Sequence, residues 1–182
     1  MRHYTVEESA FSHFFFNNTK VSWFWLIVRL YVGYEWVTAG WGKVTNVAWV
    51  GPDSGTAISG FVSGALKKTA GAHPDVQGWY ADFLQNVVLA YPTLWSWLIT
   101  FGELAVGIGL ILGALTGIAA FFGFFMNLNF LLAGTVSVNP VLLTLSLGLI
   151  LAWKISGYIG VDRFLLPRLG IYLGKEVTDN NT

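Results

Sequence analysis

The chain contains no cysteine, and this absence excludes several kinds of chemistry. Without thiols the protein has no disulfide relay, thiolate nucleophile, iron–sulfur cluster or cysteine-based metal site. Histidine is scarce too, because only His3, His13 and His73 occur and none lies inside an apolar run. We therefore expect neither a haem held by imidazoles within a bilayer nor another metal site. A glycine-rich loop for a nicotinamide cofactor is also lacking.

Charged residues are also scarce in this chain. Only 11% of the 182 residues are charged, compared with roughly 25% in an ordinary soluble domain. The 10 Lys and Arg residues balance 10 Asp and Glu residues, so the basic excess typical of a nucleic-acid-binding protein is missing. Hydrophobic residues make up 54% of the chain and include 9 Trp, 7 Tyr and 14 Phe. Because such rings gather at bilayer interfaces, the composition predicts one domain whose partner is the lipid bilayer.

Four apolar runs are long enough to cross a bilayer, which takes about 20 residues in a helix. They cover residues 21–42, 92–113, 114–134 and 140–160. The second and third runs abut, and a tight hairpin is predicted between them from the residues that supply the break: Gly109, Gly113, Thr116 and Gly117. The sequence therefore predicts an all-α membrane protein with a bundle of four transmembrane helices.

The segment 43–91 between the first two runs is predicted to be an outer loop with structure of its own. Apolar residues recur at helical spacing over 58–66 and again over 79–88. Both segments are too short to span a bilayer. We expect two amphipathic helices that lie at the membrane interface, pack on the ends of the bundle, or cover its mouth as a lid.

Lysine and arginine are distributed unequally between the loops. The terminal segments 1–20 and 161–182 carry five of them, and the outer loop carries three. Four spans place both termini on one side, and the side richer in Lys and Arg is usually cytoplasmic. We therefore expect a cytoplasmic N-terminal segment (1–20), a membrane domain (21–160) and a cytoplasmic C-terminal tail (161–182).

Four ionisable residues, Arg29, Glu35, Glu103 and Lys154, lie inside the predicted spans. Each costs several kcal/mol in hydrocarbon unless it is paired or hydrated. At a rise of 1.5 Å per residue, Arg29, Glu103 and Lys154 fall in the same half of the bundle, and Glu35 lies higher. We expect Arg29 to meet Glu103, whereas Lys154 either joins them or extends to the nearby interface.

Helical phase places further polar and aromatic residues near these charges. Arg29, Trp36 and Lys43 share one face of the first span, with Tyr31 and Glu35 on a neighbouring face. The third span adds two amides, whose hydrogen-bonding groups need partners in a dry environment: Asn127 and Asn129. The cluster fits either a ligand or proton site or a purely structural ion pair that fixes helix register.

Two sequence stretches carry a resemblance to a known family. Residues 29–44 read RLYVGYEWVTAGWGKV and residues 102–123 read GELAVGIGLILGALTGIAAFFG. Both resemble signature spans of the DoxX/DoxD family, and NFLLAGTVSVNPVLL and LAWKISGYIGVDRFLLP resemble its later part. The positions that match the two motifs are Arg29, Gly33, Gly40, Lys43, Glu103, Gly107 and Gly113.

This resemblance implies a four-helix protein of a bacterial or archaeal cytoplasmic membrane. The DoxD branch is similar to the large subunit of thiosulfate:quinone oxidoreductase, which joins two thiosulfates into tetrathionate and reduces a quinone. For this chain the resemblance implies a quinone-linked membrane oxidoreductase or its membrane subunit. A quinone would be its co-substrate, and a small DoxA-like subunit would be its partner. A second copy of the chain, in a homo-oligomer, is the other partner that we consider. The alternative functions are a non-enzymatic scaffold or assembly subunit of a redox complex and, last, a small-solute transporter.

On the oxidoreductase hypothesis each candidate residue has a role. Glu103 or Glu35 would deliver protons to the reduced quinone, and Trp36 and Tyr31 would form walls of the ring pocket. Arg29 with Lys43 or Lys154 would hold an anion. The amides of the third span, Asn127 and Asn129, complete the predicted substrate- or quinone-binding set.

The predicted topology is testable by cysteine labelling, because the native chain has no thiol to interfere. Ser63→Cys in the outer loop should react with an impermeant maleimide added to intact cells, whereas Asn180→Cys in the C-terminal tail should be spared. The reverse pattern would invert the predicted orientation.

Overall fold

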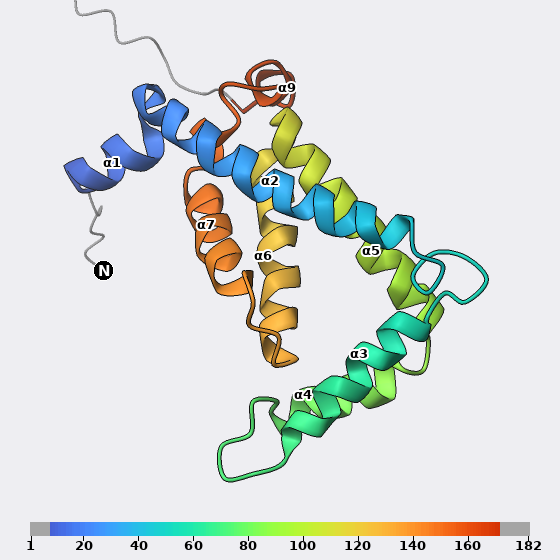
Figure 1. The fold of residues 1–182 in the computed structure, drawn as a ribbon. Coiled ribbons are helices and arrows are strands. Elements are labelled where there is room, and N and C mark those ends of the chain that lie inside the picture. Colours follow the sequence, from blue (N-terminus) through green and yellow to red (C-terminus); the bar gives the residue numbers. More distant parts are fainter. Residues whose placement is uncertain (1–7, 172–182) are drawn as a thin grey trace, which may run out of the picture.

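The computed structural model describes residues 8–171, which form helices and loops without a β-strand in that range (Figure 1). The all-α expectation is therefore confirmed. The helices, of which η1 and η2 are 3₁₀ and η3 is a π-helix, are α1 (Ala10–Asn17), η1 (Thr19–Val21), α2 (Ser22–Val44), α3 (Thr56–Leu66), η2 (Lys67–Thr69), α4 (Gly78–Phe83), η3 (Leu84–Val88), α5 (Pro92–Leu112), α6 (Thr116–Leu132), α7 (Asn139–Leu151), α8 (Trp153–Ser156) and α9 (Asp162–Arg168). The part of the predicted C-terminal tail after residue 171 lies outside the described residues.

The first three apolar runs form the helices α2, α5 and α6 with nearly the predicted bounds, but the fourth run does not. A single helix over 140–160 is wrong, because α7 ends at Leu151 and the short α8 follows it. The backbone carbonyls of Ser156 and Ile159 accept hydrogen bonds from the Arg29 side chain. The chain leaves the helical path here, and two of its carbonyls contact the buried Arg29 side chain. Hydropathy does not predict this helix break, because it depends on a contact with a distant residue.

Within residues 8–171, α5 is the one helix that is both long and apolar enough to cross a membrane by itself. The apolar helices α6 and α7 have 17 and 13 residues, or about 26 and 20 Å, against a hydrocarbon core of about 30 Å. The 23 residues of α2 suffice in length but include three charged side chains. The four-span bundle therefore stays a prediction.

Glycines bring α2 and α5 into close antiparallel contact. A Cβ atom on Gly107 would lie 2.6 Å from the backbone nitrogen of Val37, and one on Gly40 would lie 2.9 Å from the backbone nitrogen of Leu104. A Cβ atom on Gly33 of α2 would lie 3.1 Å from the carbonyl oxygen of Gly107 on α5. The two backbones approach this closely because these positions carry no side chain.

The second pair of long helices, α6 and α7, forms a hairpin beside α2 (Figure 1). Residues of α2, α5, α6, α7 and α8 make one apolar core that centres on Trp25, Val32 and Leu110. A second core joins α3, α4 and η3 through their buried residues, including Ile58, Val62 and Leu84. The predicted short helices of the segment 43–91 are thus present, and they pack on each other and against α5.

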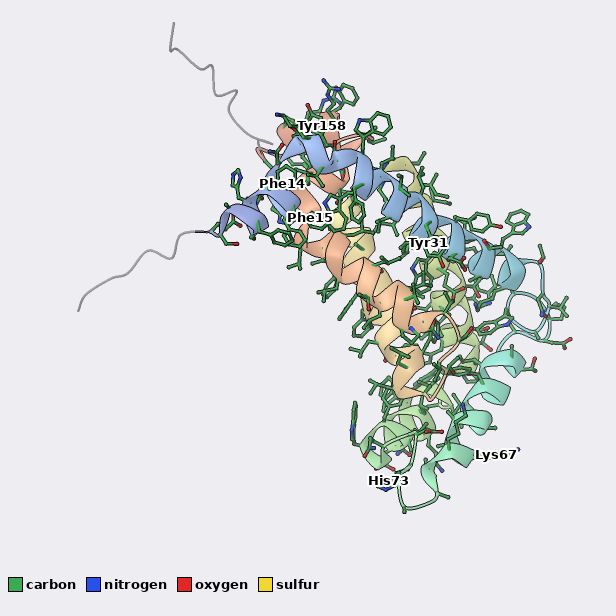
Figure 2. All side chains as sticks on the ribbon, turned by 60° about the vertical axis from the view of Figure 1, so that its left-hand side comes forward. Phe14, Phe15, Tyr31, Lys67, His73 and Tyr158 are labelled. Carbon is green, nitrogen blue, oxygen red and sulfur yellow. The ribbon has the colours of Figure 1, made fainter. Side chains whose placement is uncertain are left out.

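We refer to the two ends of the helical body as the α3–α4 end and the α9 end. Figure 2 shows Lys67 and His73 at the former and Tyr158 and Phe14 at the latter. Between them, many large apolar side chains lie on the outside of the long helices. They include Ile27, Tyr34, Leu98, Ile118 and Phe125, each at least half exposed. An apolar exterior this extensive is typical of a surface that contacts lipid or another protein.

The glycine contacts predict a stability difference between two alanine substitutions. Gly107→Ala should destabilise the protein by about 1–3 kcal/mol, because the new methyl group meets backbone atoms that have no free rotamer. Gly42→Ala is the matched control, since nothing lies within 4 Å of its Cβ position. It should be neutral or stabilise α2 by roughly 0.5–1 kcal/mol. Thermal unfolding in detergent measures both, and equal midpoints would contradict the packing described.

Candidate functional site

Three side chains at seven-residue intervals on α2 point into the protein. Arg29 and Trp36 are 1% and 2% exposed, and the Lys43 side chain is 19% exposed. Each meets a different part of the fold. Arg29 reaches the α8–α9 loop, Trp36 packs on α6, and Lys43 pairs with α5.

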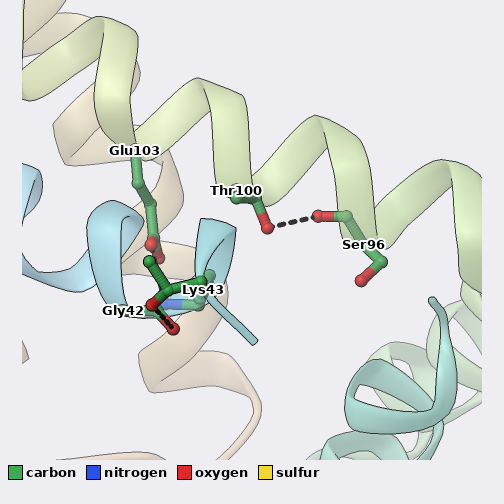
Figure 3. Close-up of polar contacts among 6 residues, drawn as sticks. Gly42, Lys43, Ser96, Thr100 and Glu103 are labelled. Atoms are coloured by element: carbon green, nitrogen blue, oxygen red, sulfur yellow. Dashed lines mark hydrogen bonds and ion pairs between the residues drawn. The ribbon is translucent and has the colours of Figure 1, made fainter. Parts of the chain in front are cut away.

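Glu103 and Lys43 form an ion pair between α5 and α2. The Nζ atom of Lys43 lies 2.6 Å from Oε2 of Glu103, and the glutamate is 1% exposed. Figure 3 shows Glu103 pointing from α5 toward Lys43. The ammonium also lies 5.0 Å from the ring centre of Trp49, which is close enough for a cation–π interaction. Trp49 and Ser96 were not predicted from the sequence; the Ser96 hydroxyl holds this loop by donating to the Trp49 carbonyl at 2.8 Å.

The predicted contact between Arg29 and Glu103 is wrong. Arg29 lies 14 residues, or about 21 Å, along α2 from the lysine that holds Glu103. The guanidinium donates to the carbonyls of Ser156 at 3.3 Å and Ile159 at 2.7 Å. Opposite Arg29 lies Gly113, the residue directly after α5, and a Cβ atom there would collide with the guanidinium. The antiparallel register of α2 and α5 determines which residue lies opposite Arg29 and which lies opposite Glu103. The predicted depth of each residue along its helix does not reveal this register.

Asp162 completes the cluster around Arg29 and was missed by sequence reasoning. Its carboxylate oxygens accept hydrogen bonds from the backbone N–H groups of Leu115 at 2.6 Å and Thr116 at 2.8 Å, at the start of α6. The side chain is 1% exposed, and its negative charge lies in the field of Arg29. The predicted topology places this residue in a cytoplasmic tail, and no pattern around it indicates burial.

Two predicted residues, Trp36 and Asn127, are buried without side-chain hydrogen-bond partners among residues 8–171. The indole Nε1 of Trp36 and both polar atoms of the Asn127 side chain are unpaired, as is Ser146 Oγ on α7. Trp36 approaches α6 at Gly123, where a Cβ atom would lie 3.0 Å from the indole nitrogen. Asn127 is one helical turn further along α6. Buried polar groups without a partner are uncommon, and they indicate a place where water or a ligand supplies one.

An apolar pocket of about 730 Å³ lies between α5 and α6. This volume is within the range of about 300–1,000 Å³ that is typical of ligand sites. Helices α3, α4 and η3 contribute to its lining at the α3–α4 end. Residues that line it along α5 and α6 include Leu98, Gly102, Ala105, Val106, Gly109, Leu112, Ile118, Phe122, Met126 and Asn129.

A hydrogen-bonded pair, Tyr80 and Asn129, supplies the polar part of this lining. The hydroxyl oxygen of Tyr80 is 2.9 Å from the Asn129 carbonyl oxygen and 3.1 Å from its side-chain Oδ1. Burial raises the pKa of Tyr80 to about 12, so the hydroxyl stays protonated and can donate. Asn129 is a predicted site residue, whereas Tyr80 is not, because the apolar spacing of its segment indicates only an amphipathic helix and assigns no role to the hydroxyl.

Three further predicted residues do not join a site. Tyr31 is 41% exposed and does not line the pocket between α5 and α6. Glu35 is half-buried, and among residues 8–171 it forms no ion pair. Lys154 is exposed, with its Nζ atom 5.8 Å from the ring centre of Trp153. The predicted anion site of Arg29 with Lys43 or Lys154 is therefore not formed, because protein groups already hold both buried cations.

The described residues form an all-helical fold that buries two charged clusters and has one helix, α5, of membrane-spanning length and hydropathy. The chain belongs to the DoxD family, because the family model described as "TQO small subunit DoxD" matches residues 24–178. This confirms the resemblance seen in the sequence and corrects one detail, since the description names the small subunit and we had expected the large one. No curated protein and no solved structure matches the chain.

The observed pairing predicts which substitutions are coupled. Removing one partner of a buried ion pair typically costs about 3–5 kcal/mol, and the partly exposed Lys43 favours the lower end. Lys43→Met and Glu103→Gln should each lower the unfolding midpoint in detergent, and the double variant should lose less than the sum. Arg29→Gln combined with Glu103→Gln should be additive, because the two sites are far apart. Coupling in the second pair and none in the first would contradict the ion pair.

Proposed function

We propose that the chain is a membrane subunit of a quinone-linked oxidoreductase of the thiosulfate:quinone type. The description of its family supports the reaction class. The buried Lys43–Glu103 pair beside an apolar pocket is the observation on which the proposal rests. Helices α2, α5, α6 and α7 would be the four spans, in the cytoplasmic membrane of a bacterium or archaeon and with both termini in the cytoplasm.

The reaction needs a group that exchanges protons within the membrane. Two thiosulfate ions give up two electrons when the new S–S bond of tetrathionate forms, and a quinone takes up those electrons with two protons to become a hydroquinone. Glu103, a buried acid–base group, is the residue that we propose for this supply. It lies between two residues that line the pocket, Gly102 and Val106. Lys43 stabilises the carboxylate after each proton has left.

The donor side of the reaction is assigned to a partner subunit. Arg29 is held by two carbonyls and Lys43 by Glu103, so neither buried cation of α2 is available for thiosulfate. A subunit of a larger complex, as the family description has it, fits this division of labour. A small DoxA-like protein is the partner that we propose.

The engagement of Arg29 and Lys43 by groups of the protein itself also favours a second candidate function. If Arg29 and Lys43 serve only to hold helices together, the chain is an assembly subunit that anchors a redox complex without reacting itself. The two functions differ in what Glu103 must do. In the assembly subunit any residue that preserves packing suffices, whereas the oxidoreductase needs a side chain that can be protonated.

The test is thiosulfate-dependent reduction of a quinone analogue by membranes that contain the chain and its partner subunit. Glu103→Gln should reduce turnover by about 100-fold or more, because the amide cannot exchange a proton. Glu8→Gln is the matched control at an exposed position whose carboxylate accepts a hydrogen bond from Asn17, and it should retain turnover. The Lys43→Met, Glu103→Gln double variant removes both charges, so it tests whether activity is lost in a chain that still folds. Full turnover in that folded double variant would favour the assembly subunit.

A further inference from the structure

The ammonium group of Lys43 is held from two sides, by a carboxylate and by an aromatic ring. Its Nζ atom lies 2.6 Å from Oε2 of Glu103 and 5.0 Å from the ring centre of Trp49. A cation within about 6 Å of a ring centre is attracted by the π electrons of the ring face. Glu103 belongs to α5, whereas Trp49 belongs to the loop that follows α2. This loop therefore supplies one of the two contacts that position the lysine.

The α2–α3 loop, residues 45–55, is attached to the first turns of α5. The buried Ser96 hydroxyl donates to the Trp49 carbonyl at 2.8 Å, and Thr93 Oγ1 donates to the Ser54 carbonyl at 3.0 Å. The side chain of Trp49 packs at the same time against the apolar core of α3, α4 and η3. Because both the backbone and the side chain of Trp49 are held, its ring has a defined place at the end of α2.

The lysine is the more exposed member of the ion pair. The Lys43 side chain is 19% exposed, and the Glu103 side chain is 1% exposed. An ammonium ion on a flexible four-carbon stem is strongly hydrated, so water at the end of α2 competes with the carboxylate for it. The ring of Trp49 favours the position beside the carboxylate, because it replaces part of the hydration shell with a second attractive contact. Without the ring, Lys43 would be hydrated more often and would leave Glu103 buried without its charge partner.

One face of α5 holds both parts of this arrangement. Figure 3 shows Ser96, Thr100 and Glu103 in order along α5, with Lys43 next to Glu103. Ser96 precedes Glu103 by seven residues, which is two helical turns or about 10.5 Å. Helix α5 thus positions Trp49 through Ser96 and Lys43 through Glu103, so the ring and the carboxylate are held by the same rigid element.

From these contacts we infer that Trp49 is a positioning residue that holds Lys43 against Glu103. The inference rests on the proposed function for the role of Glu103 in turnover, and it adds a residue that acts through Lys43 without touching the substrate. The competing role for Trp49 is packing alone, as part of the core of α3, α4 and η3. The two roles differ in whether another aromatic ring can replace the indole and in whether the effect depends on Lys43.

Five variants of the full chain separate positioning from packing. Trp49→Leu removes the ring, and Trp49→Phe keeps a smaller aromatic face. Lys43→Met removes the cation, alone and combined with Trp49→Leu. Trp41→Leu is the matched control, because Trp41 lies two residues before Lys43 on α2 and is 62% exposed. Each variant is assayed for thiosulfate-dependent reduction of the quinone analogue in membranes that contain the chain and its partner subunit.

Trp49→Leu should lower kcat by about three- to tenfold and leave the KM for the quinone analogue unchanged, because the ring acts on Lys43 and not on the substrate. Trp49→Phe should keep about half of the native kcat or more, and Trp41→Leu should match the native chain. In the Lys43→Met background, Trp49→Leu should cause no further loss. An equal loss in Trp49→Leu and Trp49→Phe, or the same loss with and without Lys43, would assign Trp49 to packing and overturn the inference.

A measurement on the purified chain in detergent does not depend on turnover. Trp49→Leu and Lys43→Met together should lower the unfolding midpoint by less than the sum of their separate effects, and strict additivity would contradict the contact. Coupling in a chain without thiosulfate-dependent turnover would retain the positioning contact and reject the oxidoreductase. Turnover that needs Glu103 but is unaffected by Trp49→Leu would retain the oxidoreductase and reject the positioning role.

Discussion

The α9 end of the fold depends on the hydrogen bonds and charge contacts of one buried group, the guanidinium of Arg29. A cation with 1% exposure is tolerated only when protein dipoles and charges replace its hydration. The carbonyls of Ser156 and Ile159 supply the dipoles, and Asp162 supplies the opposite charge. Asp162 in turn bonds the first N–H groups of α6, and its own backbone N–H donates to the Gly113 carbonyl at 2.7 Å. One cation thereby ties α2 to the end of α5, the start of α6 and the loop before α9.

The α3–α4 end is organised differently, because Lys43 meets a charge on a neighbouring helix. Its ion pair with Glu103 links α2 to α5 where the glycine contacts have already brought the two backbones together. Close approach and charge pairing therefore support each other, since a wider gap would leave Glu103 both buried and unpaired. Trp36, halfway between the two cations on α2, faces α6 instead. A single helix face thus contacts three different parts of the structure.

The pocket between α5 and α6 is a consequence of the same constraints. Helix α5 packs mainly on α2, and α6 packs mainly on α7. A short turn joins α5 to α6 at one end, and the two helices are in less extensive contact with each other than with these partners (Figure 1). Helices α3 and α4 pack where α5 and α6 are far apart, and they bring Tyr80 to Asn129. The polar and apolar halves of the pocket therefore come from segments that are distant in the sequence. An acid–base group, Glu103, lies on the adjacent face of α5.

The sequence by itself determined the all-helical class, the bounds of α2, α5 and α6, the short helices between α2 and α5, and the family. These follow from local properties: apolar run length, helical spacing, glycine and proline at turns, and motif spacing. The partners of Arg29 and Glu103, the break after α7, and the roles of Asp162 and Tyr80 were decided only by tertiary structure. The register between two helices depends on where their small residues meet, and a shift of one or two turns exchanges every partner. Sequence spacing gives the face and depth of a charge, but which group lies opposite is a property of the packed helices.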